Sequence, residues 1–145
     1  MEKLTDEERK KQQRILSELS AHQATAEALS QHLSLLTASL SELSMTLEAI
    51  KTVKGLKPGT DILVPMGSDS FITAKLATTE KVITGLGADV VAERSSEDAL
   101  KVLEARRTEF EQALNRAREE LGKLGERMEA LRPEAERILE KARKE

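Results

Sequence analysis

The sequence predicts a mainly α-helical chain with a small β part, in which two long helices form an antiparallel coiled-coil hairpin. Two heptad patterns of similar length support this prediction, and a short stretch rich in β-forming residues and glycine separates them. The composition agrees, because charged residues make up 34% of the 145-residue chain and its only aromatic residues are two phenylalanines. Such a chain lacks the bulky side chains that usually fill a deep core, which favours long exposed helices.

The first heptad pattern lies within an expected N-terminal helix over residues 1–54. Its apolar positions are separated by alternating steps of four and three residues, which is typical of a coiled-coil seam. We expect the helix to end near Lys54, with Gly55 in a left-handed conformation and Pro58 preventing its continuation. The seam positions are Ile15, Leu19, His22, Ala26, Leu29, Leu33, Leu36, Leu40, Leu43, Leu47 and Ile50.

The second heptad pattern lies within an expected C-terminal helix over residues 95–145. A serine cap in the stretch Ser95–Asp98 and acidic residues in the first turn mark its start. The two patterns have similar lengths and a structured connector separates them, so we expect the seams to pair antiparallel within one chain. A parallel homodimer of each helix is the alternative, but it needs two interfaces where one hairpin suffices. The seam positions are Leu100, Leu103, Arg107, Phe110, Leu114, Ala117, Leu121, Leu124, Met128, Leu131, Ala135, Ile138 and Ala142.

The connector, residues 60–94, predicts two β-hairpins in series. The expected turns are Gly67–Asp69 and Gly85–Gly87, each between short runs of β-branched and apolar residues. Pro65 cannot donate a ladder hydrogen bond, so we expect it at an edge or a bulge. Hairpins this small are not stable alone, so we expect β segments of several chains to assemble into an intersubunit β-barrel. The residues expected to assemble it are Ile62, Val64, Phe71, Ile72, Leu76, Val82, Ile83, Val90 and Val91.

Two stretches of the connector, Leu63–Ile72 and Val82–Val91, carry a resemblance to a known family. The start of the second helix at Glu97–Ala99 and the stretch Leu131–Glu136 look like the same family. The sequence resembles the alpha-type subunit of prefoldin, an ATP-independent chaperone, so residues 1–145 are expected to form a single prefoldin-like unit. Two hairpins fit the alpha type, whereas the beta type is built around one. The short connections and the absence of tail extensions point to an archaeal form.

The resemblance implies a heterohexamer of two alpha-type and four beta-type subunits, with the β segments forming a central barrel. The coiled-coil arms would project from this barrel, and their tips would capture non-native polypeptides and prevent their aggregation. The captured polypeptides would then pass to a group II chaperonin. No cofactor is expected.

The client-binding site is expected at the helix tips, where the two seam patterns do not match. The first seam fades before Ile15, and only Leu4 is apolar there, whereas the second helix keeps its apolar residues and would face a polar partner. Pro133 favours a kink or a frayed tip. The alternative is that seam residues such as Leu131 and Ile138 only finish the coiled coil. The expected client-binding residues are Leu4, Ile15, Met128, Leu131, Ile138 and Leu139.

Other classes of function fit less well. The net charge is −3 with interspersed signs, which argues against a nucleic-acid or ribosome-associated hairpin. The charged N-terminus is unlike a signal peptide and no apolar run could cross a membrane, so we expect a cytoplasmic protein without a membrane partner. No nucleophile is paired with a base and no metal site is indicated, so we expect no enzyme. A structural coiled-coil tether without client-holding activity is the remaining alternative, but a tether needs no β module.

Overall fold

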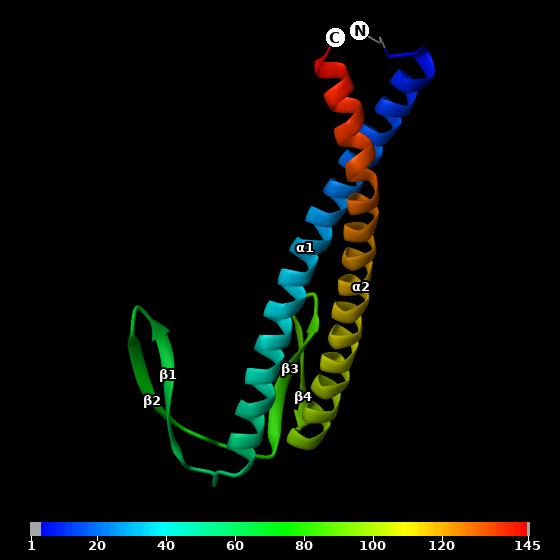
Figure 1. Cartoon of the computed structure of the whole chain (residues 1–145). Helices are drawn as coiled ribbons and strands as arrows, with labels where there is room; N and C mark the ends of the chain where they lie inside the picture. Colours follow the sequence, from blue (N-terminus) through cyan, green and yellow to red (C-terminus); the bar gives the residue numbers. More distant parts are fainter. Residues whose placement is uncertain (1–3, 145) are drawn as a thin grey trace. The chain divides into compact units, whose positions relative to one another are not determined.

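The computed structural model describes residues 4–144 and contains two long helices and two β-hairpins (Figure 1). The chain divides into two compact units, which we call the β unit (residues 38–111) and the terminal unit (residues 1–37 and 112–145). The element order confirms the predicted fold class. The elements are helix α1 (Asp6–Lys54), strands β1 (Asp61–Gly67), β2 (Ser70–Lys75), β3 (Lys81–Gly87) and β4 (Val90–Ser95), and helix α2 (Ser96–Arg143).

Helix α1 begins with a capping box. The Thr5 Oγ1 atom accepts a hydrogen bond from the backbone N–H of Glu8 (3.2 Å), and Glu8 Oε2 accepts one from the backbone N–H of Thr5 (2.9 Å). Two donors that a helix start leaves unpaired are thereby satisfied. Asp6 and Glu7 add negative charge at the positive end of the helix dipole. The start of α1 is therefore set by local side chains, ahead of the first seam residue.

Helix α1 ends at Lys54, as predicted, but the conformation predicted for Gly55 is wrong. The backbone N–H of Gly55 donates to the carbonyl oxygen of Thr52 (3.1 Å), so the last turn tightens to a 3₁₀ type and needs no positive φ. The left-handed glycine is Gly59, with φ of 85°. It follows Pro58 in a type II turn, in which the third position requires such a φ. The positive-φ glycine after α1 therefore lies four residues further along the chain than predicted.

Helix α2 begins at a serine cap, as predicted. Ser95 Oγ accepts a hydrogen bond from the backbone N–H of Asp98 (3.1 Å). The neighbouring Ser96 is buried, its Oγ donates to the carbonyl oxygen of Thr79 (3.0 Å), and its N–H donates to the carbonyl oxygen of Glu80 (2.8 Å). These two bonds join the start of α2 to the residues just before β3.

The two hairpins share one geometry, since β1 begins at residue 61 and β3 at residue 81, and each has a register shift before its turn. Both turns contain two residues with positive φ, which matches the twist of β-strands. The first turn, Ser68–Asp69, lies within the predicted segment. The second turn was predicted at Gly85–Gly87 but lies at Ala88–Asp89. Gly85 pairs with Val91 in the ladder, so these glycines belong to the end of β3 and to its register shift.

Each hairpin forms a separate two-stranded sheet, so every strand keeps an open edge within this chain. Pro65 pairs with Phe71 directly before the register shift of the first hairpin. Its predicted placement at an edge or bulge is therefore confirmed. A proline at such a position removes no ladder hydrogen bond that the hairpin needs.

The core of the β unit is built by seam residues of both helices. Leu47 is 1% exposed and Leu103 is 8% exposed, and residue numbers in this core add to about 150 across the seam, as antiparallel pairing requires. Val82 of β3 packs against the same core, so the second hairpin covers one side of the helix pair. The buried members are Leu43, Leu47, Ile50, Ala99 and Leu103, with Val82, Leu100 and Phe110 packed against them.

Candidate functional site

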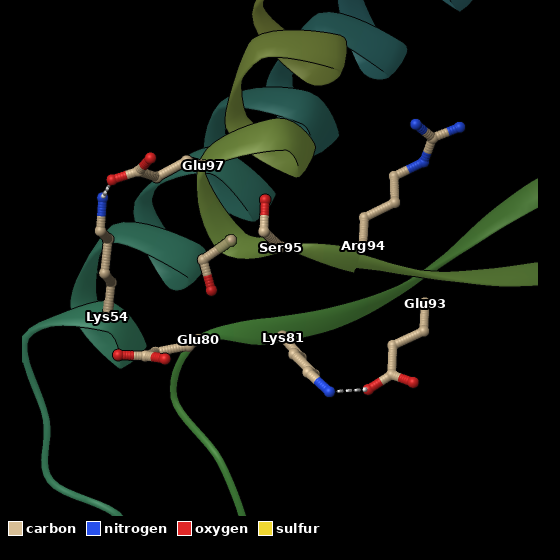
Figure 2. A pocket seen from close by; sticks show the side chains of 8 residues that line it. Lys54, Glu80, Lys81, Glu93, Arg94, Ser95 and Glu97 are labelled. Carbon is tan, nitrogen blue, oxygen red and sulfur yellow. Dashed lines mark hydrogen bonds and ion pairs between the residues drawn. The ribbon is translucent and has the colours of Figure 1, made fainter.

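A polar cleft of about 550 Å³ lies in the β unit where α1, the second hairpin and α2 meet (Figure 2). Two ion pairs lie in it: Lys54 Nζ is 3.2 Å from Glu97 Oε1, and Lys81 Nζ is 3.8 Å from Glu93 Oε1. All four side chains are largely exposed, so each pair contributes little to stability. Acidic and basic side chains are balanced in this cleft, so we interpret it as part of the contact between the second hairpin and the helices, not as a binding site. Its lining residues are Lys54, Glu80, Lys81, Glu93, Arg94, Ser95, Ser96 and Glu97.

The first hairpin presents apolar side chains to solvent. Leu63 and Met66, each 67% exposed, were not among the predicted assembly residues, although the continuous apolar run of β1 was a signal for both faces. Large exposed apolar side chains on both faces of a two-stranded sheet favour interaction with another surface. Of the predicted residues, Val64, Phe71 and Ile72 are exposed, whereas Ile62 and Leu76 are half-buried.

The second hairpin has one face on the helices and one face free. Val82 is half-buried against the core, whereas Ile83 is 72% exposed. On the helix side, Arg94 Nε donates to Thr84 Oγ1 (3.1 Å), which lines a cleft of about 230 Å³ beside α1 and α2. The other predicted assembly residues of this hairpin, Val90 and Val91, are exposed.

The terminal unit contains a small apolar cluster of Ile15, Ala135 and Ile138, with Leu19 packed against it. Ile15 is 2% exposed and Ile138 is 7% exposed. The prediction that Ile138 faces a polar partner is therefore wrong. Antiparallel pairing brings together residues whose numbers add to about 150, so Ile15 meets the stretch that contains Ala135. Leu4 is also buried.

Two leucines of the terminal unit remain exposed beside this cluster in the sequence. Leu16 is 41% exposed and Leu139 is 42% exposed. Each directly follows a seam residue of the same heptad type, Ile15 or Ile138, and in an antiparallel pair such positions flank the same side of the seam. Leu139 was a predicted client-binding residue, whereas Leu16 was missed, although its place next to Ile15 was visible. The remaining predicted residues, Met128 and Leu131, are half-buried.

Ion pairs between α1 and α2 close the terminal unit. Glu8 Oε1 accepts a hydrogen bond from Lys141 Nζ at 2.8 Å, and Lys11 Nζ lies 3.3 Å from Glu134 Oε1. The Lys141 ammonium, together with the backbone N–H of Thr5, holds the pKa of the Glu8 carboxyl below its ordinary value. Glu8, in the N-terminal stretch where the first seam fades, therefore has a polar partner on α2.

His22 occupies the seam, as predicted. Its side chain is 15% exposed, and its Nε2 lies 3.5 Å from Glu18 Oε1 without making a hydrogen bond to any described residue. Over residues 4–144, no group of three or more acidic or histidine side chains is arranged to hold a metal ion. Neither helix, within the part of the chain that the structure describes, has a stretch long and apolar enough to cross a membrane.

A family model described as prefoldin subunit matches residues 22–141. The chain belongs to the prefoldin family. This prefoldin subunit is 36% identical to the prefoldin subunit alpha of Methanopyrus kandleri over 109 residues, which is 75% of this chain and 69% of that protein. It is 33% identical to the prefoldin subunit alpha of Methanosphaera stadtmanae over 133 residues, which is 92% of this chain and 95% of that protein. The predicted resemblance to an archaeal alpha-type subunit is confirmed.

Solved structures show the same prefoldin fold. A filamentous PFD from Methanocaldococcus jannaschii is similar with a TM-score of 0.71 and 28% identity, over 82% of this chain and 98% of that chain. The prefoldin beta subunit from Thermococcus strain KS-1 is similar with a TM-score of 0.58, over 96% of this chain and 97% of that chain. At 15% identity, the second likeness concerns the fold alone.

Proposed function

We propose that this chain is a subunit of an ATP-independent chaperone that holds non-native polypeptides at the end of its terminal unit. The observation that carries the proposal is the pair of exposed leucines, Leu16 and Leu139, on one side of a seam whose adjacent residues are buried. Exposed apolar carbons at such a site can contact apolar segments of many different clients, because the hydrophobic effect is non-directional. Membership of the prefoldin family supports the same conclusion.

The proposed assembly is a heterohexamer of two chains of this type and four beta-type subunits. Open strand edges and exposed apolar residues such as Phe71 and Ile83 support assembly through the hairpins. A two-stranded sheet is marginally stable in water, so hairpins of different chains would stabilise one another by pairing. The complex would pass its clients to a group II chaperonin, and transfer of a labelled client to such a chaperonin tests this step.

The test of the holding site replaces Leu16 and Leu139 together by serine, in the full chain co-expressed with a beta-type subunit. Leu35→Ser is the matched control, because Leu35 is 68% exposed on α1 of the same unit. We expect the double variant to lose most of its ability to suppress client aggregation without ATP, whereas the control keeps it. Native mass spectrometry verifies that both variants form the same complex. Equal suppression by wild type and double variant would rule out these leucines as the holding site.

A coarser test deletes residues 1–12 and 136–145. We expect the truncated chain to assemble with its partner, because the hairpins are unchanged, but to lose client holding. Full holding activity in the truncated complex would contradict a site at this end of the chain.

A structural coiled-coil tether is the second candidate, and the burial of Ile15 and Ile138 is the observation that favours it. A tether needs a closed seam and no exposed client surface. The aggregation assay separates the two, because a tether would assemble normally and yet leave client aggregation unchanged.

A further inference from the structure

We propose that the ion pair of Glu8 and Lys141 is a clasp that keeps the end of the terminal unit closed, and that its opening exposes the cluster of Ile15 and Ile138 to clients. This inference rests on the proposed client-holding function and adds a regulatory contact to it. Leu16 and Leu139 then provide the first contact with a client, and the buried cluster provides a second contact after opening.

The clasp uses both oxygen atoms of the Glu8 carboxylate, and each oxygen makes a different contact. Glu8 Oε2 accepts the backbone N–H of Thr5 and completes the helix cap (2.9 Å), whereas Oε1 accepts Lys141 Nζ (2.8 Å). One side chain therefore fixes both the first turn of α1 and the contact of that turn with α2. The side chains of Lys141 and Glu8 remain 34% and 39% exposed, so salt and competing charges can reach the contact.

The segment of α2 that closes this end is attached through a weakened turn. Pro133 lies inside α2, where it removes a backbone hydrogen bond and crowds the preceding turn. Residues 134–143 can therefore swing or unwind with less resistance than an uninterrupted helix end. Everything that α2 contributes to the cluster and to the two ion pairs follows this proline, namely Glu134, Ala135, Ile138 and Lys141.

The interactions that hold the end of the terminal unit closed are weak. The second ion pair, between Lys11 and Glu134, is more exposed than the clasp, with side chains 43% and 42% accessible, and such pairs contribute little. A weakly closed end has a minor open population that a ligand can select. A client with apolar side chains binds Ile15 and Ile138 only in the open form, so it shifts the population toward opening.

The first experiment measures opening directly, by hydrogen exchange of residues 4–20 and 131–143 in the complex with a beta-type subunit. Glu8→Gln keeps an oxygen for the cap but removes the charge, and Lys141→Gln removes the cation without touching the cap. Arg132→Gln is the control, because Arg132 pairs with Glu129 inside α2 (3.2 Å). We expect either clasp variant to exchange roughly two- to fivefold faster, as befits a partly exposed pair, and the control to match wild type. Unchanged exchange in both clasp variants would overturn the clasp.

The second experiment locks the end closed. The natural chain has no cysteine, so Glu8→Cys combined with Lys141→Cys offers one site for a short bismaleimide linker, with a cysteine-free partner subunit. We expect the linked complex to suppress client aggregation several-fold less than the same double variant without linker. Equal suppression with and without the linker would show that clients do not need the opening. Failure of the wild-type complex to hold clients would instead refute the proposed function, while the exchange data would still decide whether the clasp exists.

Discussion

The β unit and the terminal unit use the same two helices to build cores of different kinds. In the β unit, Leu47 and Leu103 have a third layer, because Val82 of β3 packs against the helix pair. In the terminal unit, the cluster of Ile15 and Ile138 comes from the two helices, and a charged pair lies near its end. The same two helices can therefore stay packed in the β unit while their contact opens in the terminal unit.

The largest effect is expected from Leu47→Ala in the β unit. Leu47 is 1% exposed, so its truncation leaves a cavity and should lower the free energy of unfolding by about 2–5 kcal/mol. Chemical denaturation of the assembled complex measures it. Leu47→Met is the control, because a swap of similar volume should cost less than about 1.5 kcal/mol. Equal losses for alanine and methionine would contradict the tight packing of this core.

Ile15→Ala breaks the terminal cluster and tests whether that unit opens separately. Ile15 is 2% exposed, so the local packing loss resembles that of Leu47. We expect a smaller shift of the global unfolding midpoint than for Leu47→Ala, with faster hydrogen exchange confined to residues near the cluster, because weakly supported segments open locally. Ile15→Val should reproduce the pattern at about 0.5–1.5 kcal/mol. A global shift as large as that of Leu47→Ala would show that the two units unfold together.

Gly122→Ala should stabilise the terminal unit by about 1 kcal/mol, because a glycine inside a helix is less favourable than alanine. A β-carbon at Gly122 would meet no atom within 4 Å, so packing does not oppose the change. Gly59→Ala is the opposite control, since Gly59 has φ of 85°, which strains any larger residue. Thermal unfolding measures both. A lower midpoint for Gly122→Ala would mean that the glycine has a structural task in the complex.

The smallest effect is a pH dependence at the clasp. Lys141 and the Thr5 backbone lower the folded-state pKa of Glu8, so its contribution is present at neutral pH and is lost as the pH falls through that lowered pKa. Lys11 and Glu134 form the neighbouring charged pair. We expect the difference in hydrogen exchange between wild type and Glu8→Gln to shrink on acidification. A difference that stays constant from neutral to acid pH would exclude Glu8 as the titrating group.

Most of the helical architecture could be predicted from the sequence, because it depends on local or periodic signals. Alternating steps of three and four residues predicted both seams, Pro58 set the end of α1, and Ser95 set the start of α2. The turn of the second hairpin was misplaced because Gly85 and Gly87 look like a turn, whereas the positive-φ pair is Ala88–Asp89. The first hairpin, with Ser68–Asp69 at the equivalent place, contained the information that would have corrected it.

The candidate site was harder to predict, because it depends on which residues meet across the seam. The fading of apolar residues in α1 suggested an unmatched end, but Ile15 already reaches the stretch of Ala135 and Ile138. The sequence pattern from Thr5 to Glu8 is legible as a capping box. The ion pair of Glu8 with Lys141 could not be predicted, because it depends on the exact register of the two helices.

The bonds of Ser96 have a mechanical consequence. A force applied along α2 reaches the second hairpin at two points, through the covalent bond to β4 and through the hydrogen bonds from Ser96 to the residues before β3. Both strands of that hairpin then share the load at the same end, where it does not peel them apart. A force along α1 reaches the first hairpin through the non-helical residues 55–58, after which hydrogen bonds of Leu76 with Gly59 (2.7 Å) and Thr60 (3.0 Å) join the two ends of that hairpin. Tension on either helix would therefore load both strands of one hairpin, directly from the first residue of α2 but through a non-helical connector after α1.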